Sequence, residues 1–414
     1  MQNLNKLSIL KYSFIVFPLA FAGIPIYLHA PDYYSTNLGI KIEIIGFALL
    51  LLRLIDAFLD PLIGYYSDKF YYLRDKFIYI GSINLILGFW MIFHPISENI
   101  LLWFCLSVFI CTFGFSLVII NVQALGGLWN VSSKKIVVVM TTREGIGLIG
   151  LLTASVTPPV LFIFYGDQNF HILSLILIII MLLSLILFYF WHKVADISKP
   201  KVAEDKIDYR KIFQNKRLKI FYFAYFFSSF AASIPATMII FYVRDYLMAE
   251  KFLGLFLLIY FLSGALSMPL WKYLSRKYSS IHSWFFSMIF ALFSFIWAFF
   301  LEPNQIAGFF IICLMSGIAV GANLALPSAI IAEFITSNKY HEYASSYYSI
   351  TNFLSKFSLA IASGFALPIL GFLGYQPGVV RSDYLLPLIY ALFPCFILVI
   401  SAILLSKLLD KKSV

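Results

Sequence analysis

The residues of this chain that could carry chemistry are concentrated in one apolar segment, residues 43–66. Arg53, Asp56 and Asp60 stand there at positions i, i+3 and i+7, among Leu, Ile, Phe and Ala. This spacing places the three side chains on one face of a helix. Each carboxylate in the middle of a membrane-spanning helix costs about 2.5–3.5 kcal/mol of insertion free energy, and Arg53 can balance only one by pairing with Asp56. We therefore expect Asp56 and Asp60 to bind Na⁺ or a proton, since hard cations prefer carboxylate oxygens.

A purely structural role for the two acids is the alternative. Asp56 would then pair with Arg53, and Asp60 would bond to a neighbouring helix. The second half of the chain has a matching segment in which Gly264 and Met268 occupy the two acid positions. A structural need would show in both halves, and ionisable residues inside a membrane bundle are functional candidates by default. These two points favour cation binding.

The composition places these charges in a lipid bilayer. Of the 414 residues, 61% are hydrophobic and only 12% are charged, which is about half the charged share of a soluble domain. A water-soluble fold of this length cannot hide so much apolar surface, and this excludes a soluble enzyme. No long strand-like alternation is present, so the predicted fold class is an all-α membrane protein whose backbone polar groups bond within helices.

The net charge of +10 is spread over short segments between apolar runs. This distribution indicates membrane topology and does not suggest nucleic acid as a partner. The four cysteines lie in apolar stretches, with no paired spacing and no histidine at ligand spacing. We therefore expect no disulfide framework, no cofactor, and no metal beyond a transported Na⁺.

Apolar runs of about 20 residues predict twelve transmembrane helices. The longest polar gap, residues 193–217, divides them into two six-helix halves, residues 1–192 and 218–414, and we interpret it as a cytoplasmic linker. The predicted spans are 10–29, 43–66, 77–95, 100–128, 141–165, 171–192, 218–243, 252–274, 281–301, 305–332, 346–373 and 384–407.

Charge counting predicts the orientation of these helices. With both termini in the cytoplasm, 23 of the 30 Lys and Arg residues fall on the cytoplasmic side and four fall outside, as the positive-inside rule requires. We expect an integral protein of the plasma (inner) membrane that works as a monomer.

The two halves also resemble each other in sequence. Residues 53–69 (RLIDAFLDPLIGYYSDK) and 261–277 (FLSGALSMPLWKYLSRK) align at an offset of 208 with seven identities. The matching segments fall on the second helix of each half. This supports two pseudo-symmetric six-helix bundles that rock about a site at the midplane of the membrane.

Residues 53–69 resemble the second-helix and loop signature of the glycoside-pentoside-hexuronide:cation symporters, the melibiose-carrier branch of the major facilitator superfamily. The resemblance continues in the same order along the chain, at residues 121–125, 142–144 and 327–333, at Asn352 and Lys356, and at residues 374–377. The family resemblance implies the major facilitator fold and cation-coupled sugar transport.

The same resemblance implies roles for individual residues. Asp56 and Asp60 correspond to the cation ligands, and Asn121 to a helix 4 aspartate that contacts both sugar and cation. Arg143 corresponds to a substrate-contacting arginine, Lys356 to a helix 11 lysine near the acids, and Lys135 to a loop residue involved in coupling. Asn121 is an amide here, and residues 17–23 lack the family's sugar-binding acid. Both changes remove negative charge, so an anionic or amphipathic, lysolipid-like substrate is the alternative to a sugar.

Several further residues are expected to form a charge network or a gate. Asn352 and Lys356 share one face of helix 11, where Lys356 either meets the acids or extends to the cytoplasmic surface. Asp68 and Lys69 end a loop motif in which Asp68 would meet the N-terminus of a neighbouring helix. Glu333 either joins this network or makes a loop contact.

Cation-coupled symport by alternating access is the function predicted by these observations together. An intramembrane enzyme is not expected, because the six histidines lie at span ends or in loops and leave no nucleophile with a base. A receptor or scaffold would not need two acids inside the membrane.

Overall fold

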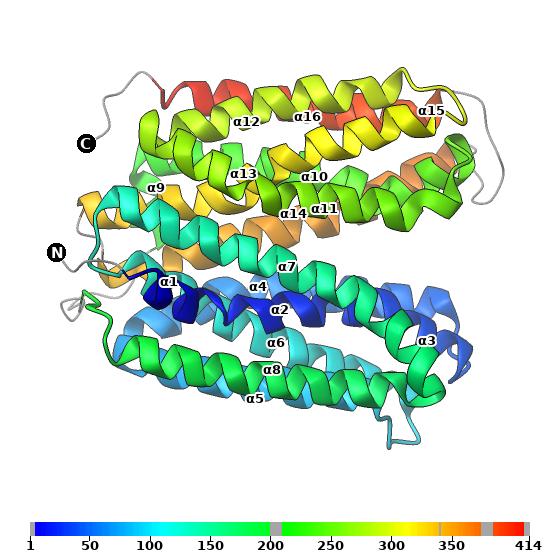
Figure 1. Cartoon of the computed structure of the whole chain (residues 1–414), viewed down its shortest axis with the longest axis horizontal. Coiled ribbons are helices and arrows are strands. Elements are labelled where there is room, and N and C mark those ends of the chain that lie inside the picture. Colours follow the sequence, from blue (N-terminus) through cyan, green and yellow to red (C-terminus); the bar gives the residue numbers. More distant parts are fainter. Residues whose placement is uncertain (1–4, 199–208, 339–340, 374–383, 410–414) are drawn as a thin grey trace. The chain divides into compact units, whose positions relative to one another are not determined.

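The computed structural model describes residues 5–198, 209–338, 341–373 and 384–409, and they are almost entirely helical (Figure 1). Ten helical segments among them are long and apolar enough to span a membrane. Helices α4 and α14 have 28 and 29 residues and complete the twelve predicted spans. The predicted all-α fold class is therefore confirmed. Residues 374–377 and Arg381, the centre of the linker and the C-terminal tail lie outside the described residues.

The chain divides into two compact units, residues 1–207 with 331–353 and residues 208–330 with 354–414. The helices of the first are α1 (Lys6–Ser13), α2 (Val16–Ile24), η1 (Pro25–His29), α3 (Ala30–Thr36), α4 (Ile42–Lys69), η2 (Tyr71–Leu73), α5 (Arg74–Phe93), α6 (Ile100–Gly127), α7 (Ser133–Tyr165), η3 (Gly166–Gln168) and α8 (Asn169–His192).

The helices of the second unit include α9 (Tyr209–Gln214), α10 (Lys216–Phe241), η4 (Tyr242–Tyr246), η5 (Glu250–Phe252), α11 (Leu253–Lys277), α12 (Ser280–Phe295), η6 (Ile296–Phe299), α15 (Leu385–Pro387), η8 (Leu388–Leu392) and α16 (Phe393–Ser406). Helices α13 (Ile306–Asn338) and α14 (Ala344–Phe372), with η7 (His341–Tyr343) between them, pass from one unit to the other.

The first span is longer and less regular than the sequence predicts. It runs from Lys6 to Thr36 and contains a π-helical turn that begins at Pro25. Another π turn, η8, follows Pro387 directly. Proline has no N–H to close the usual α-helical hydrogen bond, and a local π turn is one way in which a membrane helix accommodates that loss.

Small residues bring the helices of the first unit close together. Helices α5, α6 and α8 lie side by side (Figure 1). A Cβ atom added at Gly88 would lie 2.7 Å from the Cα atom of Cys111, and one added at Gly114 would lie 2.5 Å from the carbonyl oxygen of Gly81. Glycine contacts of this kind stabilise helix pairs in membranes, and here they fix α6, which faces the acidic segment of α4.

Candidate functional site

The two faces of α4 differ sharply in character. Large apolar side chains at positions 47, 51, 55, 58 and 62 are exposed, as expected of a surface in contact with lipid. Asp56 and Asp60 lie on the opposite side, with 4% and 0% of their surface exposed. The acids therefore point into the bundle, where a charged group needs specific partners.

Asp56 and Arg53 have different immediate partners. The hydroxyl of Ser116 on α6 donates a hydrogen bond of 2.8 Å to Asp56 Oδ1. The guanidinium of Arg53 lies over the ring of Tyr27, 4.3 Å from its centroid, in a cation–π contact. In the described part of the chain, Arg53 and Asp56 form no ion pair, because the arginine is drawn toward η1 instead of along its own helix.

Asn121 is fully buried on α6 but lies away from the face that meets Asp56. Its amide nitrogen donates to the carbonyl of Leu117 at 2.8 Å, and its Oδ1 has no hydrogen-bond partner among the described residues. Five residues separate it from Ser116, a rotation of about 140° around the helix. The structure thus does not bring Asn121 into hydrogen-bond contact with either aspartate.

The C-terminal half of α4 packs tightly against the beginning of α14. A Cβ atom at Gly64 would lie 2.7 Å from Ser349 Cβ and 3.1 Å from the carbonyl oxygen of Ser345, and it would overlap Ser349 Oγ. Only glycine permits this approach without displacing α14.

Asp68 holds the N-terminus of α14 one turn below this contact. Its two carboxylate oxygens accept hydrogen bonds from the backbone N–H groups of Ser345 at 2.8 Å and Ser346 at 2.7 Å. These groups have no partner within the helix, and the helix dipole favours an anion beside them. Arg74 completes the cluster with a 2.5 Å ion pair to Asp68 and a bond to Ser345 Oγ. Lys69 is exposed and lies over Phe70.

Asn352 makes a second contact between α14 and α6, within the first unit. Its amide nitrogen donates to Gln123 Oε1 on α6 at 2.9 Å. Gln123 is seven residues after Ser116, so the two lie on one face of α6. Lys356, one turn further along α14, is half-buried and belongs to the second unit. Glu333 and Lys135 are also half-buried.

Arg143 is fully buried near the start of α7 and pairs with Glu144. The rings of Tyr12 and Tyr348 press on the last turn of α6, where Cβ atoms added at Gly126 and Gly127 would lie 2.7 Å from Tyr12 Cζ and 2.9 Å from the Tyr348 hydroxyl. The side chain of Arg143 has no exposed surface.

The predicted residues that lie in the first unit thus fall into distinct groups. One contains Asp56 with Ser116, and another contains Asp68 with the start of α14. Sequence reasoning missed Ser116, Gln123 and Arg74 as partners, because a serine or glutamine in an apolar helix gives no sign of what it faces. Among the described residues, no three His, Cys, Asp or Glu side chains are placed to hold a metal ion.

Comparison with known proteins places this geometry in a family context. The profile of the family described as "MFS/sugar transport protein" matches residues 13–408. The crystal structure of a bacterial homologue of the iron transporter ferroportin in its outward-facing state is similar, with a TM-score of 0.73, 15% identity, and coverage of 99% of this chain and 100% of that chain. A crystal structure of the E. coli fucose:proton symporter FucP superposes with a TM-score of 0.72, 13% identity and 98% coverage of both chains. At these identities the two structures establish the fold alone.

Proposed function

Because the chain belongs to the MFS/sugar transport protein family of the major facilitator superfamily, and is therefore a multi-pass membrane transporter and not an enzyme, we propose that it is a cation-coupled symporter. It takes up a small polar solute of the sugar class together with Na⁺ or H⁺. We place it in the plasma (inner) membrane with both termini in the cytoplasm, as the distribution of Lys and Arg predicts. The finer assignment to the melibiose-carrier branch is part of this proposal.

The buried pair Asp56 and Asp60 is the observation that carries the proposal. The two carboxylates together cost about 5–7 kcal/mol on membrane-insertion scales, so their retention on the inner face of a spanning helix indicates a function. Carboxylate oxygens are ligands that a coupling cation can bind there, with Ser116 orienting Asp56 from α6.

The second unit shows that packing does not require these acids. The position equivalent to Asp56 is Gly264, and its backbone approaches α13 so closely that a Cβ atom on Gly321 would lie 2.7 Å from the Gly264 carbonyl oxygen. The corresponding helix is therefore packed through small residues. A cation-coupling role explains why only the first unit has the acids.

The energetics of such coupling are sufficient for uptake. A single cation entering down a potential of about 100 mV contributes roughly 2.3 kcal/mol, and a tenfold gradient adds about 1.4 kcal/mol. Together they sustain an accumulation of roughly 500-fold. One cation per substrate is thus enough to make transport concentrative.

The substrate-independent test is cation binding to the purified protein. We expect Na⁺, against choline at constant ionic strength, to raise the Tm of the wild-type protein, since a ligand at ten times its Kd stabilises by about 1.4 kcal/mol. Asp56→Asn and Asp60→Asn should abolish the Na⁺ response. Asp245→Asn is the matched control, because it removes a buried carboxylate that pairs with Arg244 in the second unit. If H⁺ is the coupling ion, the Tm of the wild-type protein should depend on pH instead of on Na⁺. Asp56→Asn and Asp60→Asn should then weaken that pH dependence.

Uptake into proteoliposomes then tests coupling and substrate class. Labelled sugars and labelled lysolipid are compared under an imposed Na⁺ gradient at fixed pH, and under a pH gradient at fixed Na⁺. Cation-driven accumulation that persists in both aspartate variants contradicts the proposal. Accumulation of lysolipid alone would replace the sugar class by the amphipathic one.

A further inference from the structure

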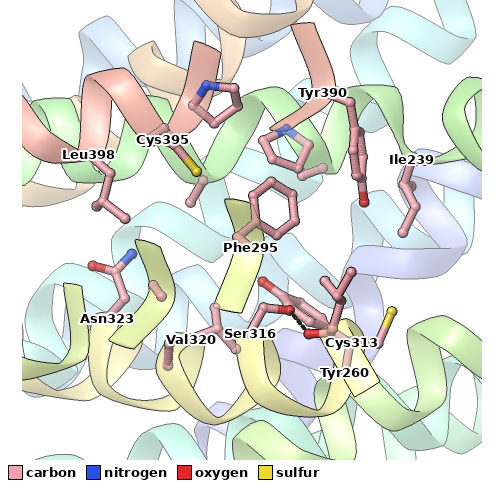
Figure 2. A pocket seen from close by; sticks show the side chains of 18 of the residues that line it. Ile239, Tyr260, Phe295, Cys313, Ser316, Val320, Asn323, Tyr390, Cys395 and Leu398 are labelled. Atoms are coloured by element: carbon pink, nitrogen blue, oxygen red, sulfur yellow. Dashed lines mark hydrogen bonds between the residues drawn. The ribbon is translucent and has the colours of Figure 1, made fainter. Parts of the chain in front are cut away.

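A cavity of about 210 Å³ lies entirely within the second unit (Figure 2). Helices α10, α11, α12 and α13 line it, together with η8 and α16. Among the described residues around it there is no Asp, Glu, Lys, Arg or His. A charged ligand would be buried there without a counter-charge, so the cavity suits a neutral one.

At one end of the cavity, the side-chain amide of Asn323 presents its two N–H groups in a fixed orientation. Asn323 Oδ1 accepts from Ser228 Oγ at 2.8 Å and from Trp284 Nε1 at 3.0 Å. An indole N–H can only donate, so the amide oxygen must face Trp284. The amide nitrogen is therefore turned the other way, toward Cys395 in Figure 2, and no residue of the described chain accepts from it.

The other polar groups around the cavity are few. Ser316 and Ser287 use their protons on carbonyls of their own helices, at 2.6 and 2.7 Å. The hydroxyls of Tyr390 and Tyr260 form no hydrogen bond within the described residues, and Figure 2 shows the Tyr390 oxygen directed into the cavity. Stacking on Tyr242, with ring centroids 4.1 Å apart, holds the Tyr390 ring in this position.

These groups limit how polar the ligand can be. A sugar has several hydroxyls, and most would lose their hydrogen bonds to water without replacement. A molecule with one oxygen fits the available groups, because that oxygen can accept from Asn323 and donate to a tyrosine hydroxyl.

The lining also favours an aromatic ligand. Five aromatic side chains border the cavity: Tyr260, Phe261, Phe295, Phe309 and Tyr390. Aromatic pairs gain from edge-to-face and offset contacts beyond simple burial. An apolar protein cavity of about 150 Å³ accepts benzene, so the larger volume here accommodates one ring with a short alkyl group.

We propose that this cavity is a binding site for a small neutral aromatic alcohol, a phenol with a short alkyl substituent. Its ring packs among the phenylalanine and tyrosine side chains, and its oxygen bonds to the Asn323 amide. The site shares no residue with the cation site of the first unit, and it is a ligand site separate from the proposed transport function.

Two native thiols provide the assay. Cys313 and Cys395 line the cavity, while Cys105 and Cys111 lie in the first unit. In a Cys105→Ser/Cys111→Ser background, the modification of the two remaining thiols by methyl methanethiosulfonate is followed by mass spectrometry. We expect 4-propylphenol to slow the modification at least tenfold, in a saturable manner, and D-glucose to have no effect.

Propylbenzene, which lacks the oxygen, is the matched probe. In the Cys105→Ser/Cys111→Ser background without further changes, propylbenzene should need about tenfold higher concentration than 4-propylphenol to give the same protection. The difference corresponds to the loss of about 1.4 kcal/mol of hydrogen bonding. Tyr390→Phe and Asn323→Leu should each reduce the difference in concentration that the two probes require. If loss of the Asn323 amide unfolds the protein, Tyr390→Phe still tests the role of the oxygen, because it removes only a hydroxyl and retains the ring. Ala319→Phe should fill the cavity and remove protection. Asn84→Leu, the counterpart of Asn323→Leu in the first unit, should leave the protection and the difference between the two probes unchanged.

Absence of saturable protection, or equal protection in Ala319→Phe, would overturn the proposal. Equal affinity for the two probes in the wild-type background would overturn the role of the oxygen. Protection by glucose would show that the cavity is a polar site. The Na⁺ response of Tm is measured in the same preparations, so failure of this proposal is distinguished from failure of the cation site.

Discussion

Replacement of Gly64 by alanine tests how closely α14 must approach α4. The new Cβ atom would lie 2.7 Å from Ser349 Cβ and would overlap Ser349 Oγ. Real atoms cannot approach so closely, so the first turns of α14 must move away. Overpacking of a tight contact costs about 1–3 kcal/mol. We therefore expect the population in which α14 is separated from α4 to rise by roughly five- to 150-fold, at tenfold for each 1.4 kcal/mol.

A cysteine in place of Ser346 reports this separation. Ser346 is fully buried, and its backbone N–H, which bonds to Asp68, is retained in the variant. In a background without the four native cysteines, the rate of maleimide labelling of the thiol at this position measures how often α14 is undocked. Gly64→Ala should increase this rate by the factor given above.

Two further variants make the test specific. Gly46→Ala, on the same helix, is the control, because no atom lies within 4 Å of its added Cβ and alanine is favoured over glycine in helices. Ser349→Gly should restore the slow labelling of Gly64→Ala, since it removes the atoms that clash. Labelling of Gly64→Ala at the wild-type rate, or an equal increase with Gly46→Ala, would refute the reasoning.

Two other contacts of α14 give predictions with the same reporter. Asp68→Asn should increase labelling more than Arg74→Gln. In Arg74→Gln the carboxylate still accepts from the backbone N–H groups of Ser345 and Ser346, whereas Asp68→Asn leaves a buried guanidinium without its charged partner, a loss of about 3–5 kcal/mol. The double variant should label more slowly than Asp68→Asn, and additive effects would contradict the ion pair. Asn352→Leu and Gln123→Leu each break the 2.9 Å hydrogen bond between α14 and α6, so each should increase labelling by about fivefold, for a loss of about 1 kcal/mol. The double variant should increase labelling no more than the larger of the two single variants. If its increase equals the product of the two single increases, the two side chains act separately.

The fold was largely predictable from the sequence. Twelve apolar runs predict the spans because a bilayer demands about 20 apolar residues for each helix, and the burial of Asp56 and Asp60 follows from the apolar residues on the opposite face of α4. The π turn at Pro25 was not predicted. A proline shows only that one hydrogen bond is missing, and neighbouring helices decide how the backbone accommodates this loss.

The site was less predictable, because its partners come from other helices. The i, i+3 spacing favours an Arg53–Asp56 pair, yet Arg53 lies over Tyr27 and Asp56 meets Ser116. Spacing on one helix cannot rank a neighbour on the same helix against one contributed by another span. The complete burial of Arg143 likewise depends on packing that the sequence does not encode locally.

The stripe Asp56, Asp60, Gly64 and Asp68 joins the proposed cation site to the docking of α14. These residues recur every four positions and extend about 18 Å along α4. Asp60 and Gly64 are one turn apart, so a change of charge at Asp60 acts directly beside the closest contact with α14. If cation binding and docking are coupled, the coupling must be reciprocal.

This reciprocity makes a quantitative prediction that rests on the proposed function. The factor by which saturating Na⁺ changes labelling at position 346 must equal the factor by which undocking of α14 changes Na⁺ affinity. Gly64→Ala should therefore shift the Na⁺ dependence of Tm, while Gly46→Ala should leave it in place. A Gly64→Ala protein that is undocked and yet binds Na⁺ with wild-type affinity would show that α14 and the carboxylates act independently, and the coupling of cation to conformation would then have to pass through another helix.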